Sequence, residues 1–270
     1  GIPYWVYIAF FIGAVCSITT VLWSVSKTPE IPPTAEELIK LKSHPKGLVA
    51  PFKEIAGAIG DMPKVMWQLG AIYLFQWYAM FCYWQFVSHS VAKSVWHITS
   101  KENPGLYGEA AGWASLLNAT YNFVTFLCAF GLAWYARKVG PKWVHFVCVA
   151  IAGTGLLIFP HLENKYAMFV PIIGLGIGWA SMMGIPYLLV VDKIPKERYG
   201  VYMGIINMMI VIPMLTQTLT FGFVYKHFLG SNPGNAIALA GAFLLIAGLL
   251  TLTIKAGRPS AADVQFSGGH

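Results

Sequence analysis

The sequence predicts an all-α membrane protein with about seven transmembrane helices. Of its 270 residues, 57% are hydrophobic and only 11% are charged, whereas a soluble domain carries about 25% charged residues. Aromatic residues reach 15%, and Trp and Tyr are favoured at membrane interfaces. Seven apolar runs are close to the roughly 20 residues that a helix needs to cross a bilayer. Together these features exclude an ordinary soluble domain.

The seven apolar runs contain no Asp, Glu, Lys or Arg, as expected from the cost of a charge at membrane depth. They cover residues 4–24, 67–88, 112–135, 143–160, 167–191, 202–224 and 237–254. The first run lacks both a basic N-terminal flank and a small-residue cleavage site. We therefore interpret it as a membrane helix and not as a signal peptide.

The segment 25–65 separates the first run from the other six and is polar. Three prolines near its start interrupt any helix there. Thr34 followed by Glu37 is typical of a capping box, which predicts a short amphipathic helix near 35–43. A second amphipathic helix near 51–60 is predicted to lie along the membrane surface, and an ordinary linker is the alternative.

The basic residues predict the orientation of the chain in the membrane. If 25–65 is cytoplasmic, 14 of the 18 Lys and Arg residues fall on the cytoplasmic side. By the positive-inside rule, the first helix then ends in the cytoplasm and the C-terminus is cytoplasmic as well. The expected location is a bacterial inner membrane or a plasma membrane, with the protein integral and multi-pass.

One helix, a long connection and six further helices match a twelve-helix transporter read from its sixth helix onward. The predicted parts are a transmembrane helix (1–24), a cytoplasmic connection with short amphipathic helices (25–65), a six-helix C-terminal bundle (66–255) and a cytoplasmic tail (256–270). On this prediction, the first helix is the last one of an N-terminal bundle. The odd helix count and the Gly at position 1 indicate a fragment without its first five helices.

Several functional classes find little support in the sequence. The net charge is +7, but the basic residues lie in loops between apolar runs, which argues against nucleic-acid binding. The four cysteines lie inside apolar runs, as small buried hydrophobic residues do. No His-Glu-x-x-His or Cys-x-x-Cys pattern occurs, so neither a metal site nor a cofactor is expected. Without clustered acids, histidines or a placed nucleophile, we do not expect an enzyme.

Polar and aromatic residues within the run 67–88 are candidates for a binding site. Tyr78 and Gln85 are seven residues apart and share one helix face, while Trp77 and Trp84 share the neighbouring face. Amides and hydroxyls can pair with the hydroxyl groups of a neutral solute, and aromatic rings can cover its apolar surface. This pattern favours a neutral, hydroxylated solute.

The next run carries a polar stripe. Asn118, Tyr121, Asn122 and Thr125 follow the i, i+3, i+4, i+7 spacing of one helix face. Two asparagines in one stripe at membrane depth are uncommon, because unpaired polar groups facing lipid are costly. The stripe predicts the lining of a cavity, and hydrogen bonding between helices is the alternative.

Later runs add further candidates. Trp179, Met183 and Tyr187 form a stripe beside a proline that is expected to kink the helix. A kink frees backbone carbonyls that can line a cavity, although ordinary packing also explains the stripe. Asn207 and Gln217 are isolated amides that flank another proline. The predicted substrate-binding residues are Tyr78, Trp84, Gln85, Asn118, Tyr121, Asn122, Trp179, Asn207 and Gln217.

Two stretches resemble a known transporter family. The first, 181–214, contains Gly184-Ile185-Pro186-Tyr187, Ile194-Pro195, the segment from Gly200 to Asn207, and the segment from Ile210 to Pro213. It resembles the tenth-to-eleventh-helix region of sucrose- and maltose-type sugar:cation symporters of the major facilitator superfamily. The second, 76–87 with 112–123, looks like the seventh and eighth helices of the same group.

One loop departs from the family pattern. The cytoplasmic signature of the superfamily ends approximately in Asp-Arg-x-Gly-Arg-Lys, whereas residues 136–142 read Ala-Arg-Lys-Val-Gly-Pro-Lys. Arg137 stands where the aspartate is expected. The loop therefore fits a basic topology anchor better than a gating contact made by an aspartate.

The resemblance implies secondary transport of a mono- or disaccharide by alternating access, coupled to a cation that is expected to be a proton. The implied partners are the sugar, the lipid bilayer and the missing N-terminal half. Only Glu109 and Asp192 lie near the spans, both at helix ends, so the coupling residue is expected in the missing half. The alternatives are a superfamily transporter of another solute, a seven-helix receptor or a transport-inactive sensor.

Overall fold

The computed structural model describes residues 4–29, 32, 34, 49–195 and 198–254. Within these residues every regular element is an α- or 3₁₀-helix, which confirms the all-α prediction. The amphipathic helix expected near 35–43 and the tail 256–270 lie outside the described residues. Of the regular elements between residues 25 and 65, the structure describes the helix α3 (Ala50–Gly60), close to the predicted bounds 51–60.

The chain divides into two compact units, Gly1–Phe52 and Lys53–His270. The helix α1 (Tyr4–Lys27) belongs to the first unit. Both threonine hydroxyl groups are satisfied within the helix, since Thr19 donates to the carbonyl oxygen of Val15 at 2.7 Å and Thr20 to that of Cys16 at 2.8 Å. Its outward side chains are mostly large and apolar, as in a helix that faces lipid or another helix.

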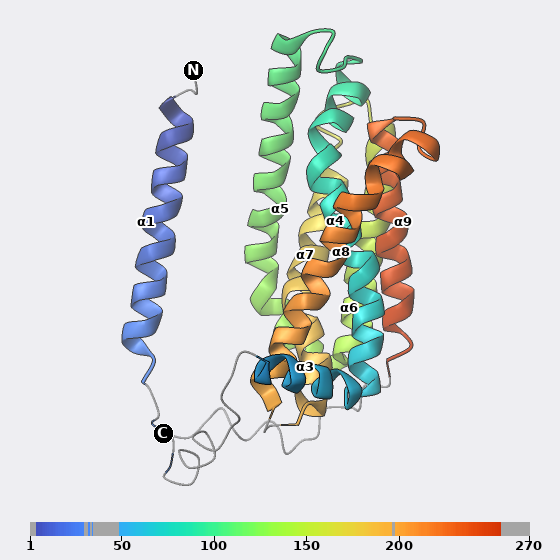
Figure 1. Cartoon of the computed structure of the whole chain (residues 1–270). Helices are drawn as coiled ribbons and strands as arrows, with labels where there is room; N and C mark the ends of the chain where they lie inside the picture. The colour runs from blue at the N-terminus through green and yellow to red at the C-terminus, as the bar shows by residue number, and fades with distance from the viewer. Residues whose placement is uncertain (1–3, 30–31, 33, 35–48, 196–197, 255–270) are drawn as a thin grey trace. The chain divides into compact units, whose positions relative to one another are not determined.

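The second unit is a bundle of six long helices (Figure 1). They are α4 (Lys64–Val95), α5 (Pro104–Val139), α6 (Pro141–Ile158), α7 (Phe169–Val190), α8 (Tyr199–His227) and α9 (Pro233–Thr251). Two short 3₁₀-helices, η1 (Phe159–His161) and η2 (Val191–Lys193), follow α6 and α7. Each predicted apolar run coincides with one long helix and differs from it only at the ends.

Local sequence explains where several of these helices begin. Asn103 caps α5, because its side-chain oxygen accepts the backbone N–H of Leu106 at 3.1 Å, and a proline occupies the first helical position. Asn232 caps α9 in the same way through the N–H of Gly234 at 3.0 Å. Such Asn-Pro pairs set the helix start, because proline needs no hydrogen bond there.

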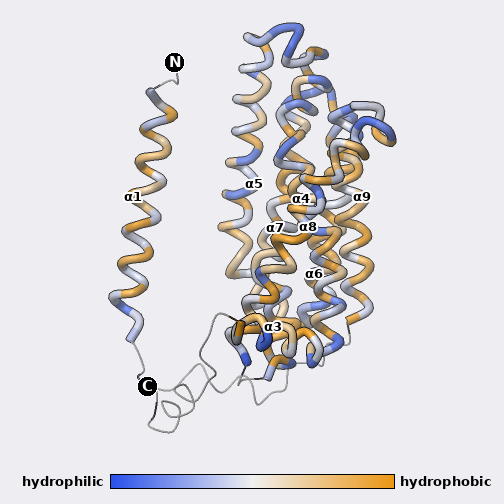
Figure 2. Tube along the Cα trace, viewed as in Figure 1, coloured by the Kyte–Doolittle hydropathy of each residue, from blue (hydrophilic) through white to orange (hydrophobic). Residues whose placement is uncertain are grey.

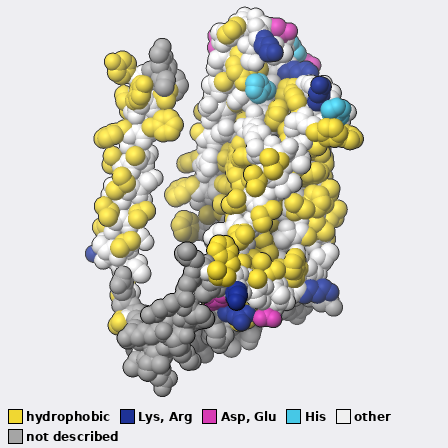
Figure 3. Space-filling model, viewed as in Figure 1, with side chains coloured by type: hydrophobic (Ala, Val, Ile, Leu, Met, Phe, Trp, Pro, Cys, Tyr) yellow, Lys and Arg dark blue, Asp and Glu magenta, His cyan; other side chains and the backbone are white. Residues whose placement is uncertain are grey.

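Six of the described helices are long and apolar enough to cross a membrane: α1, α5, α6, α7, α8 and α9. Figure 2 shows hydrophobic residues along the helices and hydrophilic ones concentrated at the helix ends. In Figure 3, charged and histidine side chains likewise gather at the two ends of the bundle. These features show an integral multi-pass membrane protein.

The helix α4 is the seventh predicted span and differs from the other six. It has 32 residues, about 48 Å at 1.5 Å per residue, so it is long enough to cross. It does not reach the apolarity of the other spans, because its middle contains several Trp, Tyr and Gln residues. Much of α4 is buried, since it packs against α5, α8 and α9.

Small residues allow a close helix crossing between α6 and α9. A Cβ atom placed on Gly241 would lie 2.6 Å from the carbonyl oxygen of Gly153, and one on Gly153 would lie 2.8 Å from that of Gly241. Both distances are shorter than van der Waals contact. Glycine at both positions therefore lets the two backbones touch, as in other closely packed membrane helices.

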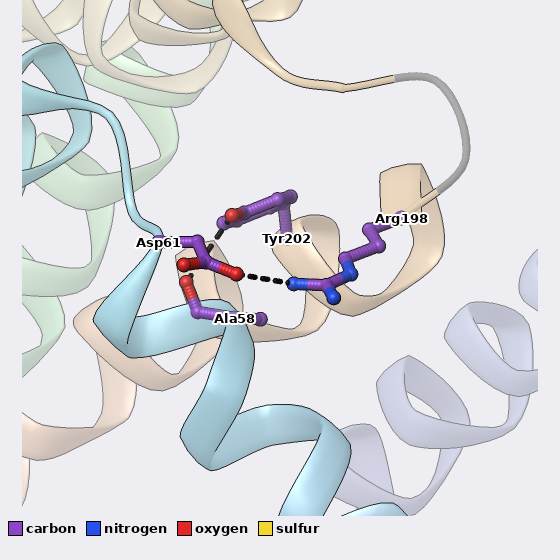
Figure 4. A network of polar contacts seen from close by, with 4 residues as sticks. All are labelled: Ala58, Asp61, Arg198 and Tyr202. Carbon is purple, nitrogen blue, oxygen red and sulfur yellow. Dashed lines mark hydrogen bonds and ion pairs between the residues drawn. The ribbon is translucent and has the colours of Figure 1, made fainter.

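Contacts with α8 hold the end of α3 at the edge of the bundle (Figure 4). Arg198, at the start of α8, donates to a carboxylate oxygen of Asp61 at 2.8 Å. Tyr202, one turn later, donates its hydroxyl to the carbonyl oxygen of Ala58 at 3.2 Å. The ion pair is solvent-exposed and worth only about 0.2–1 kcal/mol, so the buried Tyr202 ring contributes the more persistent contact.

Candidate functional site

Four aromatic side chains from three helices form a cluster near the middle of the bundle, which we call the aromatic cluster. Trp77 and Trp84 come from α4, Tyr121 from α5 and Trp179 from α7. The Trp179 ring centroid lies 5.6 Å from that of Trp77, 5.5 Å from that of Trp84 and 6.5 Å from that of Tyr121. All three contacts are edge-to-face, the arrangement that aromatic quadrupoles favour.

The aromatic cluster also carries polar atoms. Trp84 donates its Nε1–H to the Tyr121 hydroxyl at 3.2 Å, which fixes both rings. The Nε1–H of Trp77 is buried and has no hydrogen-bond partner among the described residues. Trp84 and Trp179 are only partly buried, so the cluster keeps accessible ring surface. Such surface can cover the C–H face of a sugar ring, while the indole and phenol groups bond its hydroxyls.

Amide and hydroxyl groups meet between α4 and α8. Gln217 is fully buried and donates its Nε2–H to Oε1 of the exposed Gln85 at 3.2 Å. The Gln217 Oε1 atom is buried without a partner in the described part of the chain. One turn further along α8, the Thr220 hydroxyl lies 3.2 Å from that of Tyr78. These two contacts give the bundle uncharged hydrogen-bond donors and acceptors at membrane depth.

The polar stripe of α5 divides into two kinds of contact. Asn118 accepts the hydroxyl of the buried Tyr83 at 2.8 Å, and Thr125 donates to the Gly176 carbonyl oxygen at 2.9 Å. Both bonds join α5 to a neighbouring helix, as the helix-packing alternative predicts. Asn122 is exposed and donates to the Asn118 carbonyl oxygen of its own helix at 2.8 Å. Asn122 is thus an exposed amide of the stripe that makes no hydrogen bond to another helix within the described residues.

The remaining candidates do not join these contacts. Asn207 on α8 is exposed, and its side chain makes no hydrogen bond within the described residues. Met183, two residues beyond Ser181 on α7, is 39% exposed. Of the stripe on α7, Trp179 is the residue that joins the aromatic cluster.

Sequence reasoning left out several residues that the structure adds. Trp77 shares a helix face with Trp84 in the sequence pattern but was not among the predicted substrate-binding residues. The structure shows that both rings contact Trp179. Tyr83 and Thr220 gave no distinct signal, because a single hydroxyl in an apolar run is common. Thr220 follows Gln217 by three residues, a helical spacing that could have pointed to it.

The site is electrically neutral. The ion pair that the structure describes, Asp61–Arg198, lies at the bundle end and not within the spans. The described residues also contain no group of three His, Cys, Asp or Glu that could hold a metal ion. A fully buried histidine, His145, lies elsewhere between α6 and α7, with Nδ1 2.9 Å from the Ser181 hydroxyl. The aromatic cluster and the neighbouring amides therefore suit an uncharged, hydroxylated solute.

A family model described as Major Facilitator Superfamily matches residues 1–218. The chain is 25% identical over 299 aligned positions to the sucrose transport protein SUT1 of rice, both in Oryza sativa subsp. japonica and in subsp. indica. The alignment covers 97% of this chain and 53% of each rice protein. The chain thus spans about half the length of the curated relatives that it matches.

Proposed function

The chain belongs to the Major Facilitator Superfamily, and from this premise we propose that it takes part in cation-coupled transport of a mono- or disaccharide by alternating access. The observation that carries the proposal is the aromatic cluster beside the uncharged amides of α4, α5 and α8. A sugar offers both an apolar ring face and many hydroxyls, so it matches both parts of the site. The likeness to sucrose transport proteins points to the same class of solute.

We further propose that α1 is the last helix of a preceding bundle and that α4 to α9 form the second bundle. Secondary transporters of this kind rock two bundles around a site at their interface. The helices α5 and α8 support this arrangement, because only 11% and 22% of their most apolar segments, respectively, are buried within the chain. Their exposed faces are thus free to contact another bundle. The basic loops favour a cytoplasmic C-terminus by the positive-inside rule, and we include this orientation in the proposal. The coupling ion is proposed to be a proton, bound by the preceding bundle.

Uptake by the full-length parent protein in proteoliposomes tests the function. Labelled sucrose, maltose and glucose are offered with and without an imposed pH gradient. We expect at least one sugar to accumulate, and the gradient to increase the accumulation. If folded protein takes up no sugar but moves another neutral solute, the superfamily assignment stands and the sugar proposal is wrong.

Two substitutions test the aromatic cluster in the same assay. Trp179→Ala removes the ring that touches both Trp77 and Trp84, and we expect uptake to fall about tenfold, equivalent to about 1.4 kcal/mol. Trp84→Phe keeps a ring but loses the bond to Tyr121, and we expect a several-fold higher KM.

Trp67→Phe is the matched control for Trp84→Phe. Trp67 lies on α4, like Trp84, but it is 56% exposed and outside the aromatic cluster. The control should leave uptake unchanged. Membrane abundance is measured for each variant, so that loss of protein is not mistaken for loss of function. Normal uptake by both cluster variants would move the binding site away from the aromatic cluster.

A further inference from the structure

A second cavity, unrelated to the aromatic cluster, opens at the end of the bundle where α4 ends and α9 begins. Its volume is about 330 Å³. The last turns of α4 contribute Ser90, Lys93 and Ser94, which share one helix face by their i, i+3, i+4 spacing, and His97 follows just after the end of the helix. The segment after α6 contributes His161 and Glu163, and the first turn of α9 closes the remaining side. We call this space the end cavity.

A buried hydroxyl without a partner lines the end cavity. Ser90 is only 1% exposed, and its Oγ atom has no hydrogen-bond partner among the described residues. The neighbouring Ser94 uses its own hydroxyl on the Ser90 carbonyl oxygen at 2.8 Å, so it does not satisfy the Ser90 hydroxyl. Buried polar groups nearly always have a partner. A polar group that enters the cavity would supply one.

A cationic and an anionic side chain also line the end cavity and do not form an ion pair with each other. Lys93 and Glu163 both line it, and neither forms an ion pair with any residue that the structure describes. Their side chains are exposed, so both remain available to a ligand. A cavity with an unpaired cation and an unpaired anion on its wall is complementary to a ligand that carries both charges.

The composition of the lining excludes other ligand classes. A metal ion is disfavoured, because no group of three His, Cys, Asp or Glu comes together in the described part of the chain. A sugar is disfavoured, because no Trp, Tyr or Phe lines the cavity. A simple anion would meet Lys93 but also the carboxylate of Glu163. The donors Ser90, Lys93, His97 and His161 together suit a group with several acceptor oxygens, such as a phosphate.

We propose that the end cavity binds a small zwitterion that carries a phosphodiester and a primary ammonium group. Lys93 and the Ser90 hydroxyl bind the phosphate oxygens, and Glu163 binds the ammonium group. The headgroup of phosphatidylethanolamine and free glycerophosphoethanolamine share this chemistry. A cavity at the end of a membrane bundle, among charged side chains, lies at the depth expected for a lipid headgroup.

Lipid binding to the purified chain in detergent, measured by native mass spectrometry, tests the proposal. Phosphatidylethanolamine is compared with phosphatidylglycerol, which has the phosphate but no cation. We expect phosphatidylethanolamine to bind about five- to tenfold more tightly. Glu163→Gln should abolish this preference, because it removes the partner of the ammonium group. Lys93→Ala should weaken the binding of both lipids about fivefold, because both carry the phosphate.

Glu109→Gln and Lys101→Ala are the matched controls, since both residues are exposed and neither lines the cavity. They should bind the lipids as the unchanged chain does. Elution volume and helical circular dichroism check the fold of each variant, and Lys93→Gln repeats the test with a larger side chain. Equal binding of the two lipids, or an equal loss in the controls, would overturn the proposal.

Competition by glycerophosphoethanolamine distinguishes the two sources of the ligand. Displacement of the lipid at millimolar concentration supports the proposal and shows that the headgroup alone is sufficient. Retention of the lipid, with the preference for phosphatidylethanolamine intact, supports the proposal with a membrane lipid as the ligand.

Discussion

Gln76 lies on α4 with a fully buried side chain, and neither its Nε2 nor its Oε1 atom has a hydrogen-bond partner among the described residues. Gln68, two turns earlier, is different, because its Nε2–H donates to the Thr253 carbonyl oxygen at 2.9 Å. Leaving a buried polar group unpaired costs about 1–3 kcal/mol. Gln76 therefore lowers the stability of the conformation described here.

Replacing Gln76 with leucine should raise the thermal unfolding temperature by a few degrees. The substitution keeps a side chain of similar size and removes the unpaired amide, and about 1 kcal/mol corresponds to roughly 2–4 °C for a chain of this length. Gln68→Leu is the matched control and should lower the temperature, because it leaves the Thr253 carbonyl oxygen without its amide partner. Thermal unfolding in one detergent measures both.

A lower unfolding temperature for Gln76→Leu would mean that the amide is satisfied by a group such as water, and that our reading of this residue is wrong. If the variant is more stable, its transport rate in the full-length protein is informative. A buried amide that costs stability is often kept for function, so we expect slower uptake despite the gain in stability.

Among the elements, the crossing of α6 and α9 depends on two glycines. Gly241→Ala would place a methyl group 2.6 Å from the Gly153 carbonyl oxygen, so the helices must move apart. We expect a loss of about 1–3 kcal/mol in stability, typical of overpacking. Gly222→Ala on α8 is the control, because nothing lies within 4 Å of its Cβ position.

The control should be neutral or slightly stabilising, since alanine favours the helix over glycine. Unfolding by denaturant or heat compares the two variants. Equal effects would show that helix propensity, and not the close approach of the backbones, governs these positions.

The spans could be predicted from the sequence because each depends on local apolarity, which a contiguous run displays. The pairing of helices could not, because α4 packs on α9 across more than 130 residues of chain. For the same reason, the contacts within the candidate site could be predicted only in part. Trp84, Tyr121 and Trp179 stood out as aromatic or polar stripes, but their contact depends on how three helices are rotated. Asn207 carried a similar signal, but it is exposed and makes no hydrogen bond within the described residues.

For the whole molecule, the exposed faces of α5 and α8 are the main indication of what else belongs to the transporter. Phe126 on α5 is 65% exposed and lies one turn beyond Asn122. Val147 on α6 is 49% exposed on another helix. In a two-bundle transporter, the first residue should face the other bundle and the second should face lipid.

Spin labels at these two positions test the arrangement. Phe126→Cys, labelled in the 270-residue chain, should be accessible to oxygen dissolved in the bilayer. In the full-length parent protein its accessibility should fall several-fold, because the preceding bundle covers it. Val147→Cys should show the same accessibility in both proteins. An unchanged value at Phe126 would contradict the proposed interface.

The modest apolarity of α4 also bears on how the chain is made. A helix rich in Trp, Tyr and Gln partitions into lipid less readily than its neighbours do. The helices that pack against it include α8 and α9, which follow it in the chain and therefore emerge later from the ribosome. During synthesis, we therefore expect α4 to remain at the insertion machinery, or at the membrane surface, until these later partners arrive. On this view, the residues proposed to bind a solute delay the integration of the helix that carries them.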